Sequence, residues 1–256
     1  MRPPTERLAA SPPSAPERTP PPAPRWTRQL RALLLKDLRL ELRTRETVVA
    51  MVLFAVVVMV IFQFGFGTHA DEFTRSGDLT PLAGGLLWVT IALTSVLGVG
   101  RTFVAEREQR VLEGLLVAPV PRLVLMAAKV IVIVAYLAAV EVVAVPLLGA
   151  FFVDSLSLGD VALIAVVCLL ADLGIAVLGT LLATLALFSR ARELLLPVLF
   201  LPSLVPVVIA AAGATHAVAG VANDLAEYRG YCLFLGIYAL TFALVAYATY
   251  EVVFDD

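Results

Sequence analysis

Residues 123–153 read LVLMAAKVIVIVAYLAAVEVVAVPLLGAFFV, and only Lys129 and Glu141 interrupt this run with charge. The hydrocarbon core of a bilayer is about 30 Å thick, and about 20 apolar residues in a helix cross it. Backbone polar groups find no water in lipid, so a spanning segment of this kind forms a helix. The run predicts a transmembrane helix that is longer than a straight crossing of the bilayer needs. We therefore expect its outer third to kink or re-enter the membrane.

Five further apolar runs of spanning length surround this one. Hydrophobic residues make up 60% of the 256 residues and the mean hydropathy is +0.93, which excludes a soluble domain. The runs are residues 47–66, 82–104, 161–188, 194–214 and 230–253. The sequence therefore predicts an all-α polytopic membrane protein with six transmembrane helices, and residues 47–254 form this transmembrane domain.

The basic residues are sorted by side of the membrane. Ten Lys and Arg residues precede the first run, and the second and fourth connections between runs are also basic. The other side carries only Arg75 and Arg229. Because cytoplasmic loops carry the excess of Lys and Arg, we expect both termini in the cytosol.

Two different segments precede the first run. Residues 1–24 contain nine prolines among Ser, Ala, Glu and Arg, which predicts a disordered cytosolic tail. Residues 25–46 carry a leucine stripe at helical spacing beside basic residues, with Trp26 at the start. This pattern favours an amphipathic helix lying in the inner headgroup region of the membrane lipids, and a solvated cytosolic helix is the alternative.

The connection at residues 105–122 reads AEREQRVLEGLLVAPVPR and is unusually polar for a loop between two spans. Its charged start is followed by a leucine patch, and Pro119 and Pro121 end the helix. A stiff helix of this kind suits a cytosolic partner, although an ordinary interfacial loop helix fits the pattern equally well. Neither Lys36 nor Lys129 follows a glycine, so the chain has no phosphate-binding loop. Any ATPase that drives it is a separate polypeptide.

Three charged residues lie well inside the apolar runs, away from their ends. Such residues are costly in lipid and are candidates for function. Lys129 and Asp172 come out at comparable depth, which predicts an ion pair that fixes helix register. Lys129 reaching alone to the cytosol, and a direct role in moving substrate, are the alternatives. Glu141 is expected near the outer interface.

The remaining candidates are prolines, histidines and cysteines. Pro197, Pro202 and Pro206 each remove a backbone donor and predict helix breaks in the fifth run, either a segment that rearranges during transport or a static kink. His69 and His216 are expected to be surface residues and not ligands of a cofactor. Cys168 and Cys232 are expected to be inert buried thiols. We expect no catalytic set and no metal site.

The motif E-x-x-x-x-x-L-E-x-L-L-x-x-P-x-P-R, after a basic amphipathic helix and between the second and third of six spans, resembles the ABC-2 class of ABC transporter permeases. Three stretches resemble the heme exporter protein B (CcmB) family of cytochrome c maturation more closely. They are GLLWVTIALTS from Gly85, VLEGLLVAPVP from Val111 with Ala128 and Lys129, and LLLPVLFLPSLVP from Leu194. The resemblance covers about residues 30–250.

This resemblance implies a permease subunit without chemistry or bound cofactor of its own. The ATP would bind a cytosolic ABC ATPase subunit, and the loop would be the coupling helix that docks on it. The docking residues would be Glu106, Gln109, Leu112, Glu113, Leu116 and Pro119. The implied partners are a heme-handling membrane subunit and a periplasmic heme chaperone, with heme as a candidate substrate and no nucleic acid. The alternatives are an ABC-2 exporter of a drug, lipid or polysaccharide, and a non-transporting assembly scaffold.

Overall fold

The structure is a computed structural model that describes residues 26–67, 80–108, 122–153, 156–186, 192–219 and 224–252. Within these ranges every regular element is a helix. The helices are α1 (Trp26–Thr44), α2 (Glu46–Gly67), α4 (Thr80–Glu108), α6 (Arg122–Phe151), α7 (Leu158–Ala186), α8 (Arg192–Ala219) and α9 (Leu225–Val252).

Six of these helices are long and apolar enough to cross a membrane. The candidate spans are Glu46–Gly65, Leu82–Arg101, Leu123–Phe151, Leu158–Ala186, Leu196–Ala219 and Leu225–Thr249. Each begins and ends within about one or two turns of a run expected from hydropathy, because the length of an apolar run is a local property of the sequence. The predicted fold class, an all-α polytopic membrane protein, is confirmed.

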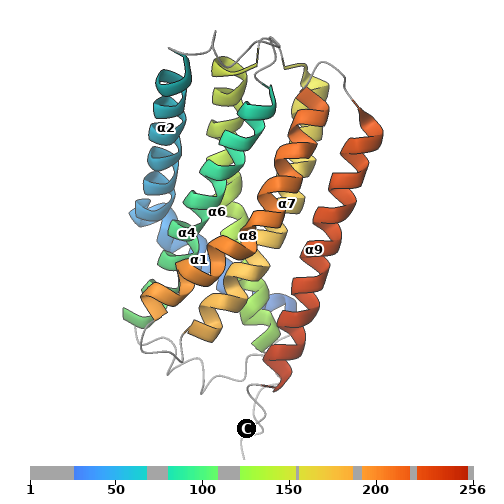
Figure 1. The fold of residues 1–256 in the computed structure, drawn as a ribbon. Helices are drawn as coiled ribbons and strands as arrows, with labels where there is room; N and C mark the ends of the chain where they lie inside the picture. Colours follow the sequence, from blue (N-terminus) through green and yellow to red (C-terminus); the bar gives the residue numbers. More distant parts are fainter. Residues whose placement is uncertain are drawn as a thin grey trace, which may run out of the picture.

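The spans form a bundle with an inner and an outer set of helices (Figure 1). More than half of the residues of α4, α6 and α7 in the spanning windows are buried, against 17% for both α2 and α9. Helix α7 packs against α4, α6, α8 and α9, while α2 packs against α4 and α6. The outer helices present leucine, isoleucine and valine side chains away from the bundle. A helix that is apolar all round fits a lipid environment.

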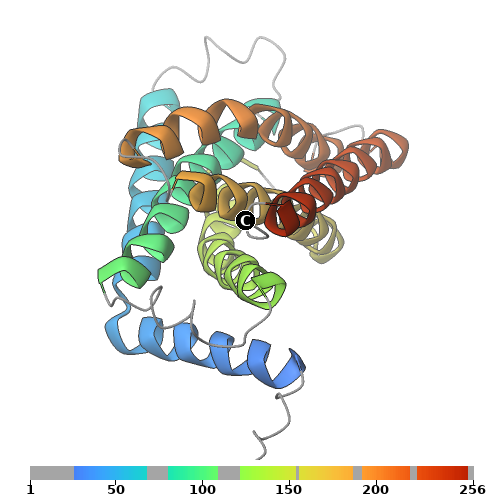
Figure 2. The same ribbon diagram turned by 90° about the horizontal axis from the view of Figure 1, so that it is seen from below.

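Helix α1 lies across the edge of the bundle and does not run parallel to the spans (Figure 2). It packs on α6, with its leucine stripe half-buried and its basic side chains exposed. Arg45 then adopts a left-handed backbone conformation, with φ 55°, so that α1 ends and α2 begins almost at once. The carboxyl Oε1 of Glu41 accepts a hydrogen bond from the backbone N–H of Val48 at 2.9 Å. It thereby satisfies one of the free donors at the start of α2.

Two other helices begin with side-chain caps. At the start of α7, the hydroxyl of Ser157 accepts a bond from the N–H of Asp160, whose carboxyl in turn accepts one from the N–H of Ser157, at 3.1 and 2.9 Å. This reciprocal arrangement is a capping box. Asp224 caps α9 by accepting bonds from the N–H groups of Ala226 and Glu227. The polar residues of these short connections are therefore used to start helices.

The inner helices approach one another closely where the sequence has small residues. A Cβ on Gly84 of α4 would stand 3.0 Å from the carbonyl oxygen of Ala212 on α8, so only glycine allows this separation comfortably. One turn further along α4, the indole N–H of Trp88 donates a hydrogen bond of 2.9 Å to the hydroxyl of Thr215 on α8. Both side chains are fully or almost fully buried, and the bond satisfies the indole nitrogen inside the bundle.

The structure bears on two expectations about helix continuity. Helix α6 runs as one helix from Arg122 to Phe151 through Pro146, so its outer third is not a separate re-entrant segment. Helix α8 likewise runs as one helix through Pro197, Pro202 and Pro206, so these prolines do not interrupt it, and the alternative of a static kink agrees with its course. A proline removes one hydrogen bond, and the remaining ladder holds a long membrane helix together. Figure 1 shows α8 oblique in its first half and upright in its second.

Candidate functional site

The expected docking segment leaves the bundle at one end. The end of α4 and the beginning of α6 both lie at the lower end in Figure 1, where α7 also ends and α8 begins. Glu106 lies in the last turn of α4, and not in the first turn of a separate helix as expected. No proline or glycine stands between Arg101 and Glu108, so nothing ends α4 earlier. Gln109, Leu112, Glu113, Leu116 and Pro119 lie outside the described residues.

Close to this end, a buried ion pair joins α1 to α6. The Nζ of Lys129 lies 3.0 Å from Oδ2 of Asp37, and their side chains are 5% and 10% exposed. Lys36 also approaches Asp37, at 3.0 Å from Oδ1, but its side chain is 43% exposed. A buried charge of this kind needs a partner of opposite sign. Asp37 therefore balances the lysine inside the α1–α6 contact.

Glu41, one turn further along α1, strengthens the same contact. Its Oε2 accepts a hydrogen bond of 3.4 Å from the hydroxyl of Tyr136 on α6, while its Oε1 binds the start of α2. One carboxylate thus links three helices. We call Asp37, Glu41, Lys129 and Tyr136 the α1 latch.

The expected ion pair between Lys129 and Asp172 is wrong. Asp172 lies beside Glu141 on α6. Lys129 precedes Glu141 by twelve residues on the same helix, which corresponds to about 18 Å along its axis. Asp172 is therefore beyond the reach of the lysine. Asp172 lies about 21 Å from the Ala186 end of α7, whereas Lys129 lies only about 10 Å from the Arg122 end of α6, which is the same end of the bundle. The depth argument from sequence therefore placed the two residues too close together.

The second group of buried polar residues is an acid pair halfway along the bundle. Glu141 and Asp172 are neighbouring residues across the contact between α6 and α7. They are 7% and 1% exposed, so the expectation of an interfacial Glu141 is corrected. The thiol of Cys168, one turn before Asp172, also lies beside Glu141. Both carboxyl groups could be recognised as unusual from the sequence, but their proximity could not be predicted from it.

Helix α8 is held to α9 beside its prolines. The hydroxyl of Tyr238 on α9 donates a hydrogen bond of 2.6 Å to the carbonyl oxygen of Ser203, the residue after Pro202. Pro202 and Pro206 are exposed on the surface of the bundle, and Pro197 is half-buried. Pro202 and Pro206 therefore face away from the inner contacts of α4 with α7.

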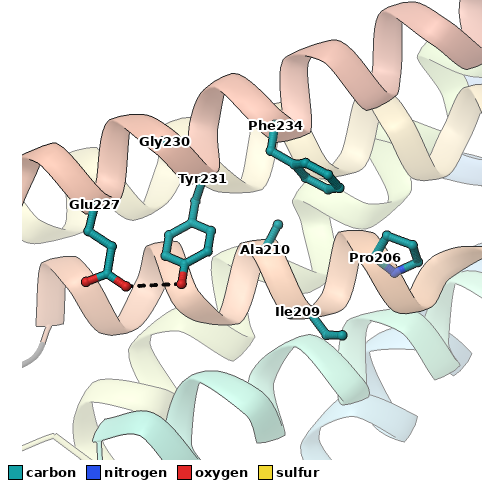
Figure 3. Close-up of a pocket in the computed structure, with 7 residues that line it drawn as sticks. All are labelled: Pro206, Ile209, Ala210, Glu227, Gly230, Tyr231 and Phe234. Carbon is teal, nitrogen blue, oxygen red and sulfur yellow. Dashed lines mark hydrogen bonds between the residues drawn. The ribbon is translucent and has the colours of Figure 1, made fainter.

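A shallow groove of about 500 Å³ runs between α8 and α9 on the surface (Figure 3). Its walls are mostly apolar, from Pro206, Ile209 and Ala210 on one side and Phe234 on the other. One polar contact lies within it, the hydrogen bond of 3.1 Å from the Tyr231 hydroxyl to Glu227. The groove carries no set of polar groups that would orient a substrate.

The remaining candidates are the histidines and cysteines. Within the part of the chain that the structure describes, no three His, Cys, Asp or Glu side chains are grouped so that they could hold a metal ion. His216 is half-buried near the end of α8, and His69 falls outside the described residues. Cys168 and Cys232 are free thiols, the first buried and the second half-buried.

Two residues of the α1 latch were missed from the sequence. Asp37 and Glu41 lie on the same face as the leucine stripe of α1, three and seven residues after Leu34. Acidic residues at stripe positions of an otherwise basic helix would have been the signal, because a side chain on that face must meet whatever the helix packs on.

Comparison with known proteins places the chain among relatives along almost its whole length. The family described as CcmB protein matches residues 28–253. Heme exporter protein B of Rhodobacter capsulatus is 30% identical over 220 residues, which cover 86% of this chain and 96% of that protein. Heme exporter protein B of Bradyrhizobium diazoefficiens is 31% identical over 192 residues, which cover 74% of this chain and 82% of that protein. The matched residues include nearly all of α1 and every span.

Proposed function

Because the chain belongs to the CcmB family, we propose that it is the permease subunit of an ABC transporter of the heme-export type. The observation that carries this proposal is the family match, which extends from α1 to the end of α9. The relatives bear the name heme exporter protein B. A multi-pass helical bundle without an ATP-binding motif agrees with a subunit that transmits movement and leaves hydrolysis to another protein.

The architecture offers a route for that movement. In the proposed complex, an ATPase subunit in the cytosol binds residues 105–122 and shifts the ends of α4 and α6. Both α4 and α6 pack directly against α7, so a shift of either helix would displace α7. The α1 latch would carry the same shift to α1, which we propose lies in the inner headgroup region. Ligands drive such changes only through contacts that differ between two states.

The partners and location follow from this assignment. The chain would lie in the bacterial inner membrane, with both termini in the cytosol and its outer helices in contact with lipid. A separate ATPase subunit would bind ATP, and this chain would bind no cofactor. A heme-handling membrane subunit and a periplasmic heme chaperone would complete the system, with heme as the candidate substrate.

Docking is tested by placing charge in the leucine patch of the loop. Leu112→Asp/Leu116→Asp should abolish co-purification of the ATPase subunit, since carboxylates cannot enter an apolar cleft without a large desolvation cost. Leu158→Asp is the matched control, because Leu158 is 88% exposed at the opposite end of the bundle and should leave co-purification intact. Undiminished ATPase binding by the double variant would contradict the docking role.

The substrate class is tested in cells. Deletion of the gene should abolish covalent c-type cytochromes, and the intact chain should restore them. Restoration by Leu158→Asp but not by Leu112→Asp/Leu116→Asp would link the docking segment to this outcome. Normal cytochrome c levels in the deletion strain would instead favour an ABC-2 exporter of another substrate. Restoration by a complex whose ATPase is inactive would favour an assembly scaffold.

A further inference from the structure

The acid pair Glu141–Asp172 is unusual because two carboxyl groups face each other inside an apolar bundle. Asp172 is 1% exposed, and its Oδ1 has no hydrogen-bond partner among the described residues. The same holds for Oε1 of Glu141. The two residues are nevertheless neighbours at a similar level of the antiparallel helices α6 and α7, which pack against each other. Ionised carboxylates only accept hydrogen bonds, so these oxygens find no donor while both groups are charged.

The two residues sit far from both ends of their helices. Glu141 lies about 15 Å from the Phe151 end of α6, and Asp172 lies about 21 Å from the Leu158 end of α7. Water is therefore remote in the packed bundle. Two like charges in contact at this depth would repel each other and would each carry a large desolvation cost.

The other titratable groups of the packed helices do not neutralise the pair. The Cys168 thiol lies beside Glu141 but carries no positive charge. On α6, Lys129 binds Asp37, and Tyr136 binds Glu41. On α9, Tyr228 and Tyr238 donate to the backbone carbonyls of Leu163 and Ser203.

Charged groups at the ends of the packed helices are also remote from the pair. His216 lies three residues before the end of α8, Glu227 and Arg229 lie in the first turns of α9, and Arg101 is exposed near the end of α4. A cation for the acid pair therefore does not come from the described side chains.

We propose that Glu141 and Asp172 form an intramembrane proton-binding site that holds one shared proton while α6 and α7 are packed. A proton on either carboxyl converts the repulsion into an O–H···O bond to the other, which is a strong charge-assisted hydrogen bond. A metal ion is a poorer occupant, because the described residues offer no group of three ligands and a thiol suits hard cations badly.

The site makes packing of α6 against α7 depend on protonation. When the two helices separate and water enters, the carboxylic O–H bond breaks, its electron pair stays on the carboxylate, and water takes the proton. Packing therefore binds a proton and opening releases one, so high pH favours the open arrangement. This inference depends on the geometry of the acid pair and holds whether or not the chain is an ABC permease.

Infrared spectroscopy of the purified full-length protein in lipid nanodiscs tests the proposal. The wild-type protein at neutral pH should show the C=O stretching band of a buried protonated carboxyl, which shifts after hydrogen–deuterium exchange. Glu141→Gln/Asp172→Asn should remove the band while keeping side-chain size and hydrogen bonding. Asp37→Asn is the matched control, since the carboxylate of Asp37 is already paired with Lys129 and should contribute no such band.

Each other result overturns the proposal. Absence of the band from the wild-type protein would show that both carboxyls are ionised, and this result needs no variant to fold. Persistence of the band in the double variant would assign it to other residues. Its loss in Asp37→Asn would assign it to the α1 latch. Its loss from the wild-type protein on addition of sodium or magnesium ions at constant pH would identify a metal cation as the occupant.

Discussion

At the scale of single residues, the charges inside the bundle are arranged in two groups of different character. Lys129 and Asp37 form a balanced pair where α1 crosses α6, whereas Glu141 and Asp172 form an unbalanced one deeper in the bundle. Removing one member of a buried ion pair costs more than the pair itself contributes, because the other charge is left in apolar surroundings. A neutral substitution should therefore lower the stability of the protein in the first group, and should relieve repulsion between charges in the second.

The balanced pair predicts a strong effect of single substitutions. Lys129→Met and Asp37→Leu should each lower the free energy of unfolding by about 3 kcal/mol, because each removes one partner of a buried ion pair and leaves the other in apolar surroundings. The double variant Asp37→Leu/Lys129→Met should recover most of this loss. Thermal unfolding of the purified protein in detergent measures all three.

Lys36→Met is the control for this prediction. It removes an amine that lies equally close to Asp37, but the Lys36 side chain is 43% exposed. Its effect should stay below about 1 kcal/mol, as for surface ion pairs. Equal losses from Lys36→Met and Lys129→Met would contradict a special role for the buried pair, as would additive losses in the double variant.

At the scale of helices, close packing around α7 decides which substitutions the bundle tolerates. Gly179 of α7 faces Val99 of α4 and Phe200 of α8, and both of these side chains are fully buried. A Cβ on Gly179 would stand 2.7 Å from Cγ2 of Val99. Val99 is β-branched and cannot rotate away freely, so the contact between three helices depends on the missing side chain.

Gly179→Ala should therefore destabilise the bundle by about 1–3 kcal/mol through overpacking. Gly236→Ala on the outer helix α9 is the matched substitution, since a Cβ there meets no other atom within 4 Å. It should raise stability by up to about 1 kcal/mol because alanine favours the helix. Thermal unfolding of both variants in detergent compares them. The same sign of effect in both would show that helix propensity, and not packing around α7, decides the outcome.

At the scale of the whole molecule, the helices of the bundle are connected so that one end gathers α1, the end of α4 and the beginning of α6 (Figure 1). The excess of Lys and Arg predicts that this end faces the cytosol. Because a proposed ATPase partner must reach residues 105–122, the orientation decides whether the proposed function is physically feasible.

Orientation predicts opposite labelling of two serine positions. In a Cys168→Ala/Cys232→Ala background, Ser76→Cys should react with a membrane-impermeant maleimide added to intact spheroplasts, since residue 76 lies in the outer connection. Ser11→Cys in the N-terminal tail should react only after the membrane is opened. Labelling of Ser11→Cys in intact spheroplasts would reverse the topology and remove the proposed docking site from the cytosol.

Much of the fold could be predicted from the sequence, and less of the candidate site. The six spans and the amphipathic α1 follow from runs and stripes of apolar residues, which are properties of each segment alone. Lys129, Asp172 and Glu141 could be recognised as unusual for the same reason. Their partners could not, because partnership depends on which helix faces which and at what depth. The docking residues beyond Glu106 lie outside the described residues and remain predictions.

The sequence by itself determined that this chain is a helical membrane protein and where each helix crosses, since burial of backbone groups in lipid leaves a long apolar segment no other conformation. Only the tertiary structure decided that α1 lies across α6, that Lys129 meets Asp37, and that Glu141 meets Asp172. Contacts between helices arise from the packing of the whole bundle, and side chains distant in sequence meet only when that packing brings their helices to a common level.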